Sequence, residues 1–167
     1  MTATTSIADQ LREGCQQAEQ LFPQNLPKLT EQLQTTADAA VAGQLENIQI
    51  GRHDIDWRGG QWHHQEWHHR LNRFLQLRAL AAAYTTSGDE QYADAARDYI
   101  ADWIQQHPPC PDWKPHVGVC ASDSNLNLSI RINGGWLGAI SAFLPSPAYD
   151  EAFLQQVVES TRAQLNW

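Results

Sequence analysis

Basic side chains gather in one short stretch of this sequence, between residues 52 and 78. The stretch holds Arg52, Arg58, Arg70, Arg73, Arg78, His53, His63, His64, His68 and His69. Only Asp54, Asp56 and Glu66 oppose them there, although the whole chain has a formal net charge of -8. A local cationic surface on an acidic protein indicates a specific anionic ligand rather than a general attraction for anions.

Within this stretch, Asn72 and Arg73 are candidates for binding a carboxylate, because an arginine donates two parallel hydrogen bonds to such a group. Tryptophans flank the pair, and their aromatic faces offer the large contact area on which sugar rings stack. We therefore predict a substrate-binding set of Trp62, Glu66, Trp67, His69, Asn72 and Arg73, with Trp57 as a further aromatic candidate. The structural alternatives are pairing of the arginine with an acidic group and burial of the tryptophans in the core.

The histidines raise the question of a metal ion. On a helix, His64 and His68 would lie one turn apart and could share a metal. The stretch lacks the His-Glu-x-x-His order of a zinc protease helix, and no third ligand is placed beside the pair. We predict no metal, no cofactor and no catalytic residue here. We expect the histidines to be solvated or ligand-facing groups that change charge near neutral pH.

Three residues from the second half of the chain join the predicted substrate-binding set: Trp113, Arg131 and Trp136. Trp113 lies in a long polar loop over residues 107–124. Arg131 precedes Gly134 and Gly135, where the missing side chains permit close approach of a ligand or of a neighbouring helix. Both readings remain open from the sequence.

Helices must position these groups, because apolar residues recur with helical spacing along most of the chain. The pattern predicts helices over residues 5–21, 26–42, 65–86, 90–106, 126–143 and 150–165. Gly88 followed by Asp89 predicts a helix end and the cap of the next helix, so residues 65–106 form an antiparallel hairpin. We interpret residues 48–60 as a loop and predict no strands, because no useful stretch alternates polar and apolar residues.

Three details of these helices are also predicted. The helix over 26–42 is expected to hold Pro27 in its first turn and to stop at Gly43. The helix over 65–86 is apolar around much of its circumference, which predicts burial on several sides. Trp103 continues the apolar stripe of the helix over 90–106, so we place it in the core.

Composition limits the class of protein. With 167 residues, 42% hydrophobic and 18% charged, the chain is predicted to be a single helical domain over residues 1–167, in which residues 1–50 form leading helices. The negative charge argues against nucleic acid as a partner, and no apolar run is long enough for a transmembrane helix. The first ten residues lack a secretory signal pattern. Cys15, Cys110 and Cys120 are interpreted as free thiols, although the last two could pair across their loop.

Several short motifs, in their order and spacing, resemble the N-terminal domain of heparinase II/III-type polysaccharide lyases. The motifs are Ile55-Asp56-Trp57, Glu66-Trp67-His68-His69-Arg70-Leu71-Asn72-Arg73, Ala83-Tyr84-Thr85-Thr86-Ser87-Gly88-Asp89-Glu90-Gln91-Tyr92-Ala93 and Ile100-Ala101-Asp102-Trp103-Ile104-Gln105-Gln106-His107-Pro108. Trp113, Arg131, Trp136 and the closing Leu165-Asn166-Trp167 follow in the family's order. The resemblance covers residues 50–167.

The resemblance implies a partial (α/α) toroid, in which helical hairpins surround an axis and leave a groove across one end. It implies an acidic polysaccharide substrate that contains uronic acid, such as a glycosaminoglycan or alginate, and cleavage by β-elimination. In that reaction a base removes the C5 proton, an acid protonates the departing oxygen, and donors neutralise the carboxylate. A periplasmic or secreted location is implied as well.

The resemblance also implies groups that this chain does not hold. The family's catalytic residues are an Asn-His or similar pair after the helix that ends near Trp167, and a Tyr and a His further on. No Asn-His dipeptide occurs in this sequence. We therefore expect the chain to form part of a sugar groove without the catalytic centre, and to act together with the rest of the toroid and a C-terminal β-sandwich domain.

Two other hypotheses come from different classes. The string from Ala83 to Ala93 also resembles one turn of a tetratricopeptide repeat, which would make the chain a protein-interaction module. No second copy follows at the period of about 34 residues, and such arrays need about three repeats. A superhelical stack of helices would favour this alternative. A histidine-rich metalloprotein is the third hypothesis, and elemental analysis would detect its metal.

Overall fold

A computed structural model describes residues 6–21, 26–64, 66–107 and 125–165 of the chain. Its helices are α1 (Ile7–Leu21), α2 (Glu31–Val41), α3 (Trp67–Asn72), α4 (Gln76–Ser87), α5 (Glu90–Gln106), α6 (Asn125–Ser129), the π-helical η2 (Ile130–Trp136), α7 (Leu137–Phe143) and α8 (Glu151–Leu165). The two-residue strands β1 (Gln44–Leu45) and β2 (Ile48–Gln49) pair antiparallel. The predicted all-α class is confirmed.

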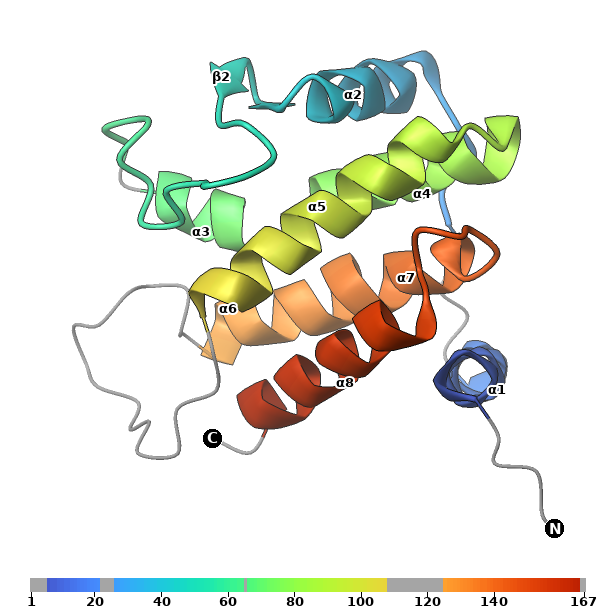
Figure 1. The fold of residues 1–167 in the computed structure, drawn as a ribbon. Helices are drawn as coiled ribbons and strands as arrows, with labels where there is room; N and C mark the ends of the chain where they lie inside the picture. Colours follow the sequence, from blue (N-terminus) through green and yellow to red (C-terminus); the bar gives the residue numbers. More distant parts are fainter. Residues whose placement is uncertain (1–5, 22–25, 65, 108–124, 166–167) are drawn as a thin grey trace, which may run out of the picture.

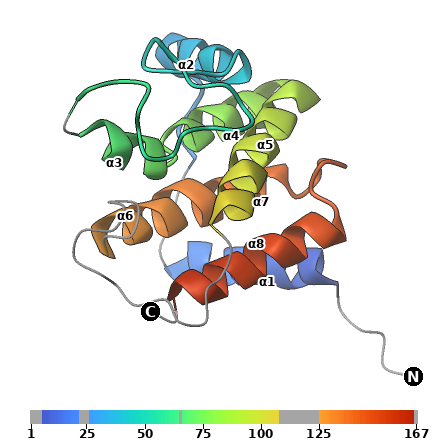
Figure 2. The same ribbon diagram turned by 60° about the vertical axis from the view of Figure 1, so that its left-hand side comes forward.

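Helix α4 lies at the centre of the packing. It contacts α2, α5, η2 and α7, and its residues from Ala79 to Tyr84 are all buried, which confirms the predicted burial on several sides. Figure 1 shows α2 above the α4–α5 hairpin, with α6, η2 and α7 in one continuous run below it. Helix α8 returns below that run, and the turned view in Figure 2 shows α1 lying against α8. Paired antiparallel helices therefore build the molecule.

Most helix ends follow the local chemistry that predicted them. Gly88 closes α4 in the left-handed conformation (φ 69°), and the Asp89 carboxylate accepts a hydrogen bond from Gln91 N at 3.1 Å as the cap of α5. Gly43, also left-handed, follows the end of α2 as predicted. The prediction that Pro27 occupies the first turn of α2 is wrong. Thr30 is the cap instead, because its hydroxyl accepts from Leu33 N and its backbone is extended.

A short hairpin replaces part of the predicted loop, so the prediction of no strands is wrong at residues 44–49. Glu46 (φ 52°) and Asn47 (φ 66°) both have left-handed backbones, which is the geometry of a two-residue hairpin turn. Each strand is only two residues long, so no alternating pattern of detectable length exists in the sequence.

The predicted helix over residues 65–86 is divided in two, because the backbone turns at Phe74. Phe74 has a φ of 56°, which ends α3 before α4 begins. A left-handed backbone at a bulky residue costs about 1–2 kcal/mol, so its surroundings must hold it there. The Phe74 ring is fully buried, stacks on Trp57 at a centroid distance of 5.1 Å and meets the edge of Trp136 at 5.7 Å.

Gly135 allows η2 to pack closely against the backbone at Phe74, where α3 ends. A Cβ atom at Gly135 would lie 3.0 Å from Phe74 Cβ and 3.1 Å from the carbonyl oxygen of Arg73. The close approach that the sequence left open is therefore made by the backbone of residues 73–74 and not by a ligand.

Asp102 of α5 holds the irregular segment that leads into α3. Its buried carboxylate accepts hydrogen bonds from Asp54 N at 2.6 Å, Ile55 N at 3.3 Å and Trp57 Nε1 at 2.8 Å. Arg52 adds an ion pair with Asp98 one turn earlier on α5, at 2.5 Å. Residues 52–57 are thereby fixed along α5, and Trp57 is placed beneath Phe74.

Substitution of Gly135 by Ala is expected to lower the free energy of unfolding by about 1–3 kcal/mol, because the new methyl group would overpack against Phe74 and a backbone carbonyl. Gly134→Ala is the matched control, since a Cβ there has nothing within 4 Å. Alanine at that helical position should stabilise by about 0.5–1 kcal/mol. Urea unfolding followed by circular dichroism measures both, and equal effects of the two substitutions would contradict the packing assigned to Gly135.

Asp102→Asn should destabilise the protein by about 1–3 kcal/mol, because an amide has one acceptor oxygen and its NH2 group would face N–H donors. Asp54→Asn removes the same charge from an exposed side chain whose left-handed backbone (φ 53°) suits asparagine. That control should stay within about 0.5 kcal/mol of the unsubstituted protein. Thermal unfolding of the two variants compares their stabilities with that of the unsubstituted protein. An Asp102→Asn variant of unchanged stability would show that the carboxylate does not anchor residues 52–57.

Candidate functional site

Helix α3 has a buried face and an outer face, and the predicted site residues are distributed between the two. Trp67 and Leu71 are fully buried. Glu66, His69 and Arg73 are exposed or half-buried and follow the i, i+3, i+7 spacing of one helical stripe. We call these three residues the α3 stripe. It is the part of the predicted substrate-binding set that the fold brings together on the outside.

Asn127 of α6 ties the α3 stripe to the second half of the chain. Arg73 Nε donates to Asn127 Oδ1 at 3.0 Å, and Asn127 Nδ2 lies 2.8 Å from His69 Nδ1. Asn127 is fully buried, whereas its two partners are half-buried. The sequence did not single out Asn127, because a lone asparagine in a helical stretch carries no signal of its contacts.

The charge of Arg73 is not neutralised by the described part of the chain. No carboxylate there lies within ion-pair distance of its guanidinium, and only its Nε atom has a hydrogen-bond partner among those residues. By contrast, Arg52 pairs with Asp98, and Arg70 of the same short helix pairs with Glu46 at 2.7 Å. The two terminal nitrogens of Arg73 can therefore donate to an anion.

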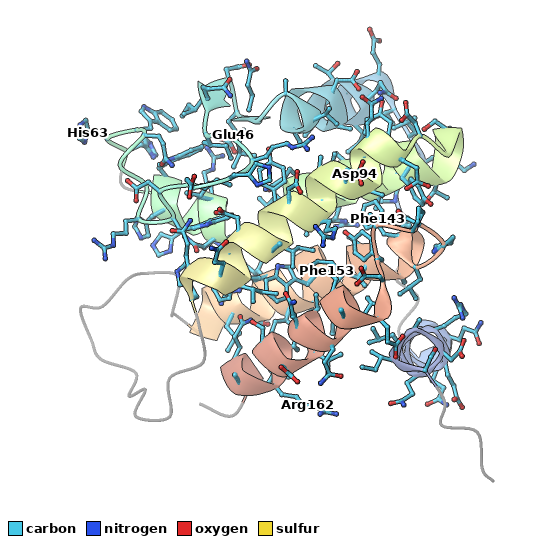
Figure 3. The ribbon with its side chains drawn as sticks, viewed as in Figure 1. Glu46, His63, Asp94, Phe143, Phe153 and Arg162 are labelled. Atoms are coloured by element: carbon cyan, nitrogen blue, oxygen red, sulfur yellow. The ribbon has the colours of Figure 1, made fainter. Side chains whose placement is uncertain are left out.

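An exposed aromatic side chain lies just before α3. Trp62 is 39% exposed, stacks on the imidazole of His64 at 4.7 Å and meets the edge of Trp67 at 5.6 Å. Figure 3 shows His63, next to Trp62 in the chain, projecting outward at the edge of this segment. Of the three tryptophans that flank Asn72 and Arg73 in the sequence, Trp57 and Trp67 are buried and Trp62 keeps an accessible face.

Two predicted site residues on α3 have structural roles instead. Trp67 is fully buried, with Nε1 donating to Gln61 Oε1 at 3.2 Å. Asn72 is also fully buried, and its amide donates to the carbonyl oxygens of Trp57 and His68 at 2.9 and 2.8 Å. Trp103 Nε1 donates to Asn72 Oδ1 at 3.1 Å. Because Asn72 joins α3, α5 and the preceding segment in this way, we withdraw its assignment as a donor to substrate.

Arg131 and Trp136 belong to the core as well. Arg131 is fully buried, donates from Nε to Gln164 Oε1 at 2.9 Å and lies over the ring of Trp103 at 4.3 Å. Trp136 is fully buried against Phe74 and Trp103. Trp103 itself is in the core, as predicted. The sequence could not separate these buried groups from ligand-binding ones, because arginine and tryptophan are typical of both.

The remaining members of the predicted set lie elsewhere. Trp113, together with Cys110 and Cys120, lies outside the described residues. Within the described residues, no group of three or more His, Cys, Asp or Glu side chains is arranged to hold a metal ion. None of the helices that the structure describes is both long and apolar enough to cross a membrane.

The electrostatics of the site are those of a crowded cationic surface. The imidazoles of His68 and His69 lie 3.9 Å apart. The pKa of His68 is lowered by partial burial and by the nearby positive charges of His69 and Arg73, whereas Glu66 raises it. A proton on His68 is therefore disfavoured first by its partial burial and then by the neighbouring His69 and Arg73.

Comparison with solved structures confirms the expected architecture. The crystal structure of heparan sulfate lyase HepC from Pedobacter heparinus matches this fold with a TM-score of 0.75 and 22% sequence identity, over 96% of this chain and 26% of that one. The chain thus spans about a quarter of the length of that lyase. The shared fold is the helical, partial (α/α) toroid that the sequence predicted. No curated protein sequence matches the chain.

The whole sequence also matches one protein family. Residues 1–167 match the family described as Heparinase II/III N-terminus. The match extends through the leading helices as well as the motifs between residues 50 and 167 that indicated this family. The chain therefore belongs to the heparinase II/III N-terminal family.

Proposed function

We propose that this chain forms one wall of the substrate groove of a polysaccharide lyase and binds an acidic polysaccharide that contains uronic acid. The observation that carries the proposal is the α3 stripe, where the guanidinium of Arg73 has no carboxylate partner in the described structure. Membership of the heparinase II/III N-terminal family supports the choice of an acidic sugar as the anion.

Each exposed group of the site has a role suited to such a ligand. Arg73 would donate its terminal N–H groups to a uronate carboxylate, with its planar fork matched to the two oxygens. Trp62 would stack on a pyranose ring, because its exposed face is broad and held by His64. Glu66 would accept hydrogen bonds from sugar hydroxyl groups, because an ionised carboxylate is a hydrogen-bond acceptor.

We propose that the reaction served by this groove is β-elimination, with the base and acid supplied from outside residues 1–167. The matched lyase is about four times as long as the aligned segment, which leaves room for the rest of a toroid and for a β-sandwich domain as structural partners. Neutralisation of the carboxylate by Arg73 would favour charge accumulation on it during removal of the C5 proton. A periplasmic or secreted location suits a polymer of this kind.

Arg73→Ala is expected to weaken binding of heparan sulfate or alginate oligosaccharides about tenfold or more, because charge-assisted hydrogen bonds of about 1.5–3 kcal/mol are lost. Arg162→Ala is the control, since Arg162 is exposed on α8 and Figure 3 places it away from α3. Calorimetric titration at constant salt measures both variants and Trp62→Ala. Equal losses for the two arginines would indicate a general charge effect and contradict a site at the α3 stripe.

The 167-residue chain should bind these polymers without cleaving them. Formation of unsaturated uronate products raises ultraviolet absorbance, so a polymer panel can be followed continuously with this chain and with a version extended beyond Trp167. Activity is expected in the extended form alone. Turnover by the 167-residue chain would contradict the proposal that the catalytic groups lie outside it.

A further inference from the structure

We infer that Asn127 is a positioning residue that sets the tautomer of neutral His69. The imidazole then carries its hydrogen on Nε2, beside the guanidinium of Arg73. The proposed function identifies the anion as part of a sugar, and the inference rests on it for that point. The arrangement of hydrogens follows from the geometry around Asn127.

The orientation of the Asn127 amide is determined by Arg73. The Nε atom of an arginine always carries a hydrogen and accepts nothing. The atom of Asn127 that lies 3.0 Å from Arg73 Nε must therefore be the oxygen, Oδ1. Because the side chain is fully buried, a rotated amide would set N–H against N–H with no water to separate them.

The oriented amide then determines the tautomer of His69. With Oδ1 toward Arg73, the NH2 group of Asn127 faces His69 Nδ1 at 2.8 Å. Because Asn127 Nδ2 is a donor, His69 Nδ1 must be an acceptor without a hydrogen. Neutral His69 therefore carries its hydrogen on Nε2. No group in the described part of the chain hydrogen-bonds to Nε2, which leaves that hydrogen for a ligand.

His69 Nε2 and the terminal nitrogens of Arg73 thus form a pair of hydrogen-bond donors that can bind one oxyanion. His69 and Arg73 lie one helical turn apart, both half-buried and both held by the same buried amide. A carboxylate or a sulfate ester has the acceptor oxygens that such a pair requires. In this arrangement neutral His69 is a hydrogen-bond donor to the ligand and not a base toward it.

Asn127→Asp is the informative substitution, because a carboxylate has nearly the same shape as the amide and accepts hydrogen bonds through both oxygens. Asn127→Asp would keep the bond from Arg73 Nε and would turn His69 over to the Nδ1–H tautomer. Long-range ¹H–¹⁵N correlation spectra, recorded at a pH where the imidazole is neutral, distinguish the two tautomers. We expect the Nε2–H form in the unsubstituted protein and the Nδ1–H form in Asn127→Asp.

Two further variants keep the test decisive. Asn133→Asp makes the same substitution at an exposed position of η2 and should leave the His69 signals unchanged. Asn127→Leu removes the donor without adding a charge, so the Nδ1 resonance should move to that of a nitrogen without a hydrogen bond. An unchanged tautomer in Asn127→Asp overturns the inference. If that variant does not fold, an unchanged Nδ1 resonance in Asn127→Leu overturns it.

Binding measurements separate this inference from the proposed function. At the same pH, where the imidazole is neutral, Asn127→Asp should weaken anion binding about tenfold or more, since His69 Nε2 becomes an acceptor and a negative charge is added. The ligands are a non-sulfated polyglucuronate and a sulfated neutral dextran, which distinguish a carboxylate from a sulfate. If neither polymer binds the unsubstituted protein, the sugar assignment fails while the tautomer result stands. Undiminished binding by Asn127→Asp contradicts the donor role of His69.

Discussion

The left-handed backbone at Phe74 is the constraint on which the arrangement of α3 depends. A continuous helix through residues 67–87 would carry α3 along the axis of α4. The turn at Phe74 instead ends α3 at Asn72, before α4 begins at Gln76. The cost of about 1–2 kcal/mol for this conformation is offset by burial of the aromatic ring between Trp57 and Trp136. Gly135 completes the arrangement, because a Cβ atom there would crowd Phe74 Cβ at 3.0 Å and the Arg73 carbonyl oxygen at 3.1 Å.

Buried polar side chains then join the elements that meet at this turn. Asn72 connects α3 to Trp57 and to Trp103 of α5, while Asp102 holds the segment before Trp57. Arg131 links Asn72 to Gln164 of α8. Such groups are stabilising only when their hydrogen bonds are satisfied, so they require one relative placement of four chain segments. This is a physical reason for polar residues of the family motif to lie inside the fold.

The same turn leaves the charged residues of α3 on the outside. Arg73 immediately precedes Phe74, and its guanidinium shares Asn127 with His69. Exposed or half-buried residues with a proposed ligand-binding role and buried residues with a structural role therefore alternate along eight consecutive residues, from Glu66 to Arg73, according to the face of a short helix. Proximity in sequence to Arg73 therefore does not separate the exposed residues from the buried ones, whereas position on the α3 stripe does.

Local sequence by itself determined the helices and most of their ends. Apolar periodicity identified α5 over residues 90–106, and the Gly88–Asp89 pair identified the turn before it, because helical spacing and capping act over a few residues. The order of short motifs identified the family. Tertiary structure alone decided that Trp67, Asn72, Arg131 and Trp136 are buried while Trp62 and Arg73 are not. It also decided the break at Phe74 and the contact with Asn127, which lies 54 residues from Arg73. Those features arise from packing between distant segments, and no local propensity of a phenylalanine or an asparagine encodes its partners.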